Sequence, residues 1–324
     1  MRAKPAKDLS QQQQLHNLGV SSFKWDLASD SVDWRGPLVD ALSPNIPFLT
    51  GSIYNARLDV DNFAVRCKAL YRAHEQKSPY KVRYCVLGND YESYAVEETG
   101  EMQHHSDGTV RAIEGSVTFL AEGELPEASR PITSSGYDAL TGFPCAALMN
   151  ETLATLIEQT HASKVPGAYL SLSFDRLLKV LFHVSPSGLE IYIKALADRV
   201  RQSIRFDDII ARTSCCTFGI ILKDCDRWGV IRASERLLHA ISVKTIEIDR
   251  EVIEPSISIG GIVFPHDETP ALEVMRRAEA CLFKEQSTKG TGGAWTPYAL
   301  GIAPELDRSA KGPVPGKRRA RDKN

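Results

Sequence analysis

The segment RFDDIIARTSCCTF, at residues 205–218, places charged, hydroxyl and thiol side chains within one short stretch. Arg205 and Asp208 stand in the order Arg-x-x-Asp. An arginine can form a bidentate contact with a phosphate or with guanine O6 and N7, and an aspartate can accept hydrogen bonds from guanine N1–H and N2–H₂. A lone Arg-x-x-Asp is expected about once by chance in a chain of this length, so its position carries the argument.

A predicted turn between two short apolar strands follows this pair. Its four residues carry small polar side chains and are Ser214, Cys215, Cys216 and Thr217. Turns between short strands normally favour Gly, Asn or Asp. We interpret the vicinal cysteines as ordinary small side chains on a turn, with a redox or soft-metal role, in which Cys225 would share, as the alternative.

The composition excludes several classes of function. The 324 residues have a formal net charge of −2, with 43% hydrophobic and 25% charged residues, so nothing favours nucleic acid or a membrane surface as a partner. The seven cysteines form no Cys-x-x-Cys and no zinc-finger spacing, which predicts no metal site. Because no apolar run approaches the roughly 20 residues of a membrane span, we expect a cytoplasmic protein with reduced thiols.

Hydrophobic patterns divide the chain into five predicted parts and give an α+β / α/β fold class. The parts are an N-terminal arm at 1–18, a domain with one antiparallel sheet at 19–121, a linker at 122–137, a domain with a mixed central sheet flanked by helices at 138–298, and a basic disordered tail at 299–324. Within the second domain, apolar spacing predicts helices over 138–159 and 188–204.

The second domain resembles the GGDEF domains of the diguanylate cyclase family. The motif DALTGFP, at 138–144, matches the opening of such domains, and the register holds to about residue 286. ALADRVRQSIRFDDIIART matches the stretch before the family's signature loop, and SISIGGIVFP and RRAEACLF match two later landmarks. The first domain resembles PAS sensor domains in SSFKWDLASDSVDW and TVRAIEGSVTFL.

The resemblance implies a degenerate active site. The family's Gly-Gly-Asp/Glu-Glu-Phe hairpin falls on the four turn residues and Phe218, and only the phenylalanine is kept. The strand position that supplies a carboxylate in the family is Ser173. The phosphate-gripping lysine aligns with Gln286, and Lys289 is the alternative for it if the loop shifts. Thiols and hydroxyls are poor substitutes for the carboxylates that Mg²⁺ prefers. We therefore predict no catalytic residue, no metal and no cofactor, and we interpret Asp175 as structural.

The resemblance also assigns a role to Arg205 and Asp208. In active members an Arg-x-x-Asp five residues before the signature loop binds the product, cyclic di-GMP, as an inhibitor, and that spacing is intact here. Arg236 stands where the family often places a second arginine. We predict a non-catalytic receptor for cyclic di-GMP that relays the ligand to a protein partner. The alternatives are a ligand-independent PAS/GGDEF scaffold and a cyclase with residual activity.

Other properties are left open by the sequence. The protein partner, the output and any ligand of the PAS-like domain are not identified, and a homodimer stays an open alternative. The predicted linker has two prolines and no heptad pattern, so a helical stalk between the domains is not expected.

Overall fold

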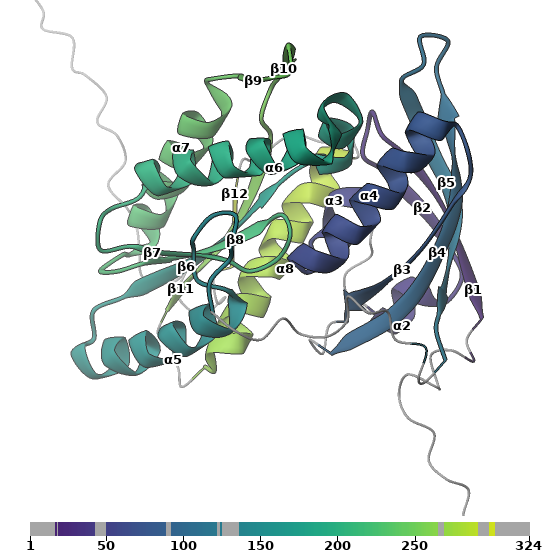
Figure 1. The fold of residues 1–324 in the computed structure, drawn as a ribbon. Coiled ribbons are helices and arrows are strands. Elements are labelled where there is room, and N and C mark those ends of the chain that lie inside the picture. The colour runs from purple at the N-terminus through teal and green to yellow at the C-terminus, as the bar shows by residue number, and fades with distance from the viewer. Residues whose placement is uncertain are drawn as a thin grey trace, which may run out of the picture.

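The computed structural model contains two five-stranded sheets, each with helices of its own, which lie side by side (Figure 1). It describes residues 17, 19–42, 50–88, 92–121, 124, 136–264, 269–290 and 298–301. Most of the predicted arm, linker and basic tail lie outside the described residues. We call residues 19–121 the N-terminal unit and residues 136–301 the C-terminal unit.

The N-terminal unit is one antiparallel sheet with helices between its second and third strands. Its elements are β1 (Val20–Asp26), β2 (Val32–Arg35), α2 (Leu38–Leu42), α3 (Gly51–Asn55), α4 (Val60–Gln76), β3 (Tyr80–Leu87), β4 (Ser93–His104) and β5 (Val110–Phe119). The strand order is β2-β1-β5-β4-β3. Alternate residues of β1 are buried, as expected for a strand with one face on a core. The predicted antiparallel sheet is therefore confirmed.

Helix α4 separates this sheet from the rest of the molecule (Figure 1). It begins after Asp59, whose carboxylate accepts a hydrogen bond from the amide of Asn62 at 2.7 Å, and it ends at Lys77 in the left-handed conformation. One side of α4 packs on β3 and another on helix α6 (Leu177–Ser203) of the C-terminal unit. The helix thus joins the cores of both units.

A buried ion pair fills the interior between α4 and the sheet. Arg66 donates to Glu98 from Nε at 2.7 Å and from Nη2 at 2.9 Å, and the two side chains are 1% and 0% exposed. Tyr80 and Tyr84 also donate to the carboxylate. Burial acts to raise the pKa of Glu98, but Arg66 and the tyrosine hydroxyls outweigh it and hold the pKa below its ordinary value.

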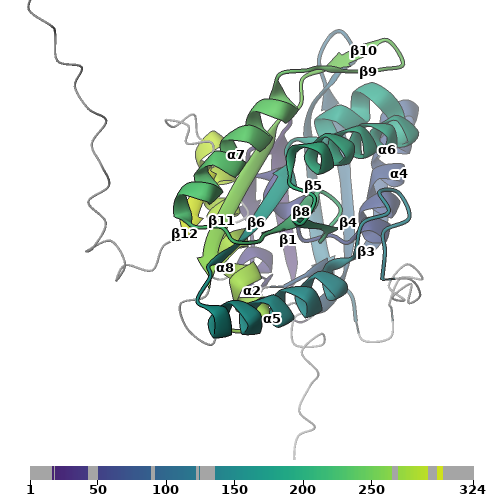
Figure 2. The same ribbon diagram turned by 90° about the vertical axis from the view of Figure 1, so that its left-hand side faces the viewer.

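The C-terminal unit has a mixed central sheet, as predicted. Its further elements are α5 (Ala146–Ser163), β6 (Gly167–Phe174), β7 (Ile209–Arg212), β8 (Thr217–Leu222), α7 (Arg227–Ser242), β9 (Ile246–Ile248), β10 (Glu251–Ile253), β11 (Ile257–Phe264), α8 (Ala271–Gly290) and β12 (Tyr298–Gly301). The order is β12-β11-β6-β8-β7, with only the β11–β12 pair parallel among these strands. Helices α5 and α8 cover one face, and α6 and α7 cover the other (Figure 2).

Three elements of the C-terminal unit differ from the sequence prediction. Helix α5 starts at Ala146 rather than at residue 138, because Asp138 and its neighbours form a turn. Helix α6 starts at Leu177 and is broken at Ser185, which has a φ of 70° and precedes Pro186. Strand β12 extends into the range assigned to the tail, since residues 298–301 pair with β11. Residues 299–301, at the start of the predicted tail, therefore form a strand, and the rest of that range lies outside the described residues.

The two units share one hydrophobic core rather than meeting through a thin contact. Buried residues of α3, α4 and the first sheet belong to the same cluster as those of α6, β6 and β8. Polar contacts accompany this packing. The amide of Arg176 donates to Ser52 Oγ at 2.9 Å, and Arg57 lies 3.8 Å from Glu279 and over the ring of Phe283. The N-terminal unit is thus positioned directly on the C-terminal one.

Candidate functional site

The signature hairpin connects β7 to β8 without any glycine in its turn. None of residues 213–217 adopts a positive φ, so glycine is not required there. Ser214 Oγ accepts hydrogen bonds from the amides of Cys216 at 3.4 Å and Thr217 at 3.1 Å. Thr213 N also donates to Thr217 O at 2.9 Å. The serine hydroxyl therefore stabilises a turn of a type that serine commonly forms.

The DALTGFP motif anchors this hairpin from the other side. Arg212 Nη1 lies 3.1 Å from Asp138 Oδ1, and Arg212 Nη2 donates to Cys215 O at 2.7 Å. Asp138 also accepts from the amide of Thr141 at 2.8 Å. The sequence singled out this motif only as a family landmark and a helix start. Its role in holding the hairpin in place depends on the contact between Asp138 and Arg212, which the sequence does not show.

The positions predicted to correspond to metal ligands in the family lie next to one another and carry no carboxylate. Ser173 of β6 lies directly opposite Thr217 of β8 in the sheet register, and the two residues are 0% and 3% exposed. Cys216 Sγ is 3.6 Å from Ser173 Oγ. The structure therefore brings together the predicted degenerate positions. Together they offer hydroxyls and thiols, which do not suit a hard cation such as Mg²⁺.

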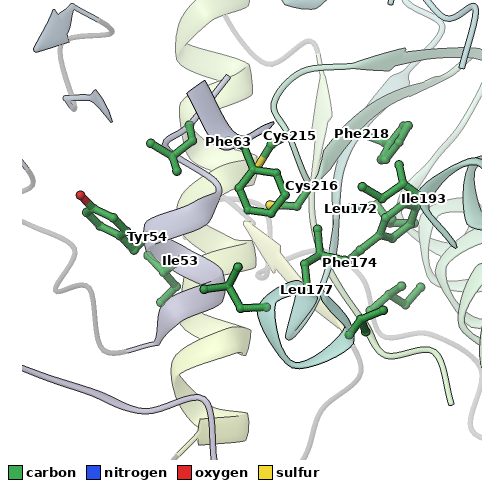
Figure 3. Close-up of a cluster of buried hydrophobic side chains, with 14 of the residues drawn as sticks. Ile53, Tyr54, Phe63, Leu172, Phe174, Leu177, Ile193, Cys215, Cys216 and Phe218 are labelled. Carbon is green, nitrogen blue, oxygen red and sulfur yellow. The ribbon is translucent and has the colours of Figure 1, made fainter. Parts of the chain in front are cut away.

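The N-terminal unit covers the tip of the hairpin. The amide of Cys215 donates to the carbonyl oxygen of Leu58 at 3.0 Å, and its thiol donates to the carbonyl oxygen of Asn55 at 3.0 Å. Figure 3 shows Cys215 and Cys216 in one buried cluster with Phe63 of α4. Burial raises the pKa of the Cys215 thiol well above its ordinary value. The pKa of the neighbouring Cys216 thiol is instead lowered, chiefly by a hydrogen bond with Cys215, so the redox role of the pair stays an alternative.

The Arg-x-x-Asp residues follow the C-terminal end of α6 and precede β7, so the length of that strand lies between them and the covered hairpin tip. Arg205 is exposed, whereas Asp208 is 4% exposed. Asp208 Oδ2 accepts from the amide of Arg205 at 2.8 Å, and Oδ1 accepts from the amide of Lys223 at 3.4 Å. Arg236 of α7 reaches the same place, since its Nε donates to Ser203 O at 2.6 Å. The structure thus brings the three predicted binding residues to one end of one helix.

Two further residues contribute to this surface and were not predicted. Phe206, inside the Arg-x-x-Asp, is 91% exposed. Arg201 supports the loop, since its guanidinium donates to Asp208 O at 3.1 Å and to Phe206 O at 3.3 Å. The surface therefore combines cationic groups with a bare aromatic ring. The sequence signal for this surface was the phenylalanine that stands among the charged residues of the motif.

Asp175 and Gln286 form a buried pair, in line with the structural interpretation of Asp175. Gln286 Nε2 donates to Asp175 Oδ1 at 2.9 Å. Ser256 and Ser258 donate to Asp175 Oδ2 at 3.1 Å and 3.0 Å. Gln286 stands at the position of the family's phosphate-gripping lysine, and here it is only 3% exposed. Its amide is therefore used inside the protein rather than toward a nucleotide.

A histidine pair lies at a second point of contact between the units. His74 Nδ1 of α4 is 3.2 Å from His104 Nε2 of β4, and the two rings stack. Phe182 of α6 packs against His74 with ring centroids 5.4 Å apart. Together with Lys179 and other residues, His74 and Phe182 line a cavity of about 230 Å³. Burial and the neighbouring His104 lower the pKa of His74.

The described part of the chain shows neither a metal cluster nor a membrane-spanning helix. No group of three or more His, Cys, Asp or Glu side chains is placed to hold a metal ion there. Among the helices described, none is long and apolar enough to cross a membrane.

The C-terminal unit has the architecture of one class of domain, in which a mixed sheet has helices on both faces and a buried hairpin at one edge. Residues 135–291 match the model of the family described as "Diguanylate cyclase, GGDEF domain". This half of the chain carries a GGDEF domain, the domain of cyclic di-GMP signalling proteins. The resemblance seen in its motifs is thus confirmed for these residues.

Curated relatives share this part of the chain at low identity. The "Probable diguanylate cyclase DgcE" of Escherichia coli (strain K12) is 22% identical over 234 residues, which cover 70% of this chain and 21% of that protein. The "Bifunctional diguanylate cyclase/cyclic di-GMP phosphodiesterase MucR" of Pseudomonas aeruginosa is 26% identical over 181 residues, 55% of this chain and 26% of the relative. The chain therefore spans about a quarter of the length of these relatives.

Solved structures of GGDEF domains align with about half of this chain at low identity. The GGDEF domain of FimX from Pseudomonas aeruginosa gives a TM-score of 0.46 at 18% identity, covering 52% of this chain and 100% of that one. The GGDEF domain of DgcB from Caulobacter crescentus, solved in complex with c-di-GMP, gives 0.47 at 15% identity, covering 52% and 96%.

Proposed function

We propose that this chain is a non-catalytic receptor for cyclic di-GMP that binds the dinucleotide at the Arg205/Asp208 surface and relays it to a protein partner. The observation that carries the non-catalytic part is the covered hairpin. Cys215 is 0% exposed and bonded through both its amide and its thiol to the N-terminal unit. A nucleotide triphosphate would have to displace that unit to reach Ser173 and Thr217.

The missing carboxylates support the same proposal. Joining two GTP molecules builds charge on phosphate oxygens, which Mg²⁺ normally offsets. At the positions that would hold it, this chain has Ser173, Cys216 and Thr217, all nearly buried. Neutral oxygens and thiols in a dry site provide neither the ligands for the ion nor compensation for its charge.

The receptor part is supported by the surface at the end of α6. Arg205 and Arg236 are exposed there, and the backbone around Arg205 is fixed by Asp208. Exposed guanidinium groups suit the two phosphates and the guanine edges of cyclic di-GMP. The ring of Phe206 is available for a base to stack on. Because this surface is separate from the covered hairpin tip, binding here does not require the units to part.

The N-terminal unit is proposed to be PAS-like. The observed order β2-β1-β5-β4-β3, with helices between β2 and β3, supports this hypothesis. The interior next to α4 is occupied by the Arg66–Glu98 pair rather than by an apolar cavity. The proposed role of this unit is therefore to cover the hairpin. The cytoplasmic location, the protein partner and the homodimer alternative stay predictions.

Two experiments test the proposal on the full chain. Calorimetric titration with cyclic di-GMP should show saturable binding, and GTP should compete poorly because its triphosphate lacks the paired bases. No binding at tens of micromolar ligand, about −6 kcal/mol, contradicts the receptor proposal. Incubation with GTP and Mg²⁺ or Mn²⁺ should yield no cyclic di-GMP. Product formed with turnover, and abolished by changing Ser173 or Thr217, would identify a residual cyclase instead.

One observation favours the scaffold as a second candidate. Both carboxylate oxygens of Asp208 already accept backbone hydrogen bonds, and the residue is 4% exposed. If its only role is to hold this loop, the GGDEF domain serves to present surfaces to partners. A titration that shows no heat with cyclic di-GMP, on a protein with a cooperative unfolding transition, assigns the chain to this second function.

A further inference from the structure

A small cavity lies where the N-terminal and C-terminal units meet, apart from both the hairpin and the Arg-x-x-Asp surface. Its volume is about 20 Å³, which is enough for one water-sized occupant. Side chains that line it include Asp30, Thr50 and Ser52 from the first unit and Asp175, Ser256 and Gln286 from the second. Every one of these six side chains carries an oxygen atom.

Two buried carboxylates, one from each unit, line this cavity. Asp30 and Asp175 are each 6% exposed. Asp30 accepts hydrogen bonds from Trp25 Nε1 at 3.0 Å and from the amide and hydroxyl of Ser52 at 3.0 Å and 2.5 Å. These donors are neutral, so they do not cancel the charge. Burial raises the pKa of Asp30 to about 6, and the charge of Asp175 acts in the same direction.

A third side chain provides an oxygen that lacks a partner. Gln286 is 3% exposed, and its Nε2 donates to Asp175 Oδ1 at 2.9 Å. This bond fixes the orientation of the amide, since the carboxylate can only accept. Gln286 Oε1 is then left buried without a hydrogen-bond partner at the cavity wall. A buried carbonyl oxygen without a donor destabilises the protein, so the site favours a positive or hydrogen-bond-donating occupant.

The local charge indicates which occupant fits. The two carboxylates carry −2, and Arg176 is the only basic residue among those that line the cavity, so the described lining has a net charge of −1. A water molecule would donate a hydrogen bond to Gln286 Oε1 but would not neutralise the negative charge of the lining. A cation with little bound water would bind Gln286 Oε1 and also neutralise that charge. Ca²⁺ accepts carboxylate, amide and hydroxyl oxygens in irregular geometry, whereas Mg²⁺ keeps several waters and needs more room.

We propose that this cavity is a binding site for one hard cation, Ca²⁺ rather than Mg²⁺, held by Asp30, Asp175 and Gln286 with nearby hydroxyl oxygens. The site takes one carboxylate from each unit, so the ion joins the two units. It therefore stabilises the arrangement in which α3 covers the hairpin. The proposal does not depend on cyclic di-GMP binding, because none of its residues belongs to that surface.

The experiment uses the full chain freed of metal with a chelator and then titrated with CaCl₂ or MgCl₂. We expect Ca²⁺ to raise the melting temperature in a saturable way, with Mg²⁺ at least tenfold less effective. Asp30→Asn and Gln286→Met should each weaken the apparent affinity for Ca²⁺ at least tenfold. Asp33→Asn is the matched control, because Asp33 is exposed on β2 and should bind Ca²⁺ like the unchanged protein.

A second readout does not depend on the stability of these variants. Because Trp25 is bonded to Asp30, Tb³⁺ in the site should emit when the indole is excited. Ca²⁺ should displace this emission, and Trp25→Phe should abolish it while keeping the Ca²⁺-dependent rise in melting temperature. The proposal is overturned if Ca²⁺ gives no saturable rise, or if both site variants respond like the Asp33→Asn control. In either case the cavity holds water alone.

Discussion

The backbone amide of Cys215 donates a hydrogen bond to the carbonyl oxygen of Leu58 across 3.0 Å, and this bond ties the tip of the signature hairpin to the N-terminal unit. The position of Cys215, which is predicted to correspond to a glycine of GGDEF domains, thus lies at the contact between the hairpin and the N-terminal unit. Its side chain is used as well, since the thiol donates to Asn55. The substitutions at the hairpin and the packing of the two units are therefore two aspects of one arrangement.

Restoring a family carboxylate at the hairpin should destabilise the protein rather than activate it. Thr217→Glu places an ionised group at a site that is 3% exposed. We expect a loss of about 3 kcal/mol or more in the free energy of unfolding and no cyclase activity. Urea unfolding measures the loss, with Thr245→Glu as the control at an exposed position. Equal stability of the two variants would show that the hairpin is open to solvent.

Removing the charge of Glu98 should be costly because Arg66 would remain buried. We expect Glu98→Gln to lower the free energy of unfolding by about 3–5 kcal/mol. Glu97→Gln is a matched control on the same strand, since Glu97 pairs with the exposed Lys81 and Arg83, and its loss should be at most about 1 kcal/mol. Similar losses in chemical denaturation of both variants would contradict the assigned burial of the ion pair.

A fall in pH should lower the free energy of unfolding of the protein, partly through protonation of His74. Its pKa in the folded state is lowered from the ordinary 6.5 by burial and by His104, so the folded state binds fewer protons than the unfolded chain. The contribution of His74 is therefore present above pH 6.5 and is lost as the pH falls through the folded-state pKa. His74→Gln should flatten this part of the stability profile between pH 5 and pH 7. His161→Gln, at an exposed position, should leave the profile unchanged.

Arg205→Ala should weaken cyclic di-GMP binding by about 1.5–3 kcal/mol, roughly ten- to more than hundredfold, because it removes a charge-assisted contact. Arg236→Ala should have a smaller effect, since Arg236 Nε is already bonded to Ser203 O. Calorimetry measures both affinities. Arg35→Ala, whose side chain is 82% exposed on β2, should bind like the unchanged protein. Unchanged affinity in Arg205→Ala would leave the scaffold as the function.

Asp208→Asn separates a role in binding from a role in folding. Asparagine keeps one acceptor oxygen for the amide of Arg205, but its NH₂ donor faces the amide of Lys223 and the guanine donors. We expect weaker binding of cyclic di-GMP together with a small fall in melting temperature. A fall in melting temperature with unchanged affinity would instead assign Asp208 to the loop alone.

Local patterns in the sequence predicted the helices and strands well, but they did not predict which residues contact one another in the folded protein. The helix over 188–204 was predicted because its apolar residues recur every three or four positions, and it forms the second part of α6. Arg66 gave no signal of burial, because its partner Glu98 lies 32 positions away on another element. Likewise, no periodicity encodes that Leu58 meets residue 215. The degenerate positions were predicted from substitutions at a known motif, which need no three-dimensional information, and they stay a prediction.

The contact of Cys215 with the N-terminal unit also sets an order of events during synthesis. Asn55 and Cys215, which this contact joins, are 160 positions apart in the chain. At about 5–20 residues per second, a ribosome makes the second roughly 8–32 s after the first. Throughout that delay the corner between α3 and α4, with Ile53 and Phe63, has no cover. The N-terminal unit is therefore made well before the hairpin that packs on it, and α8, which contacts Arg57, is made later still.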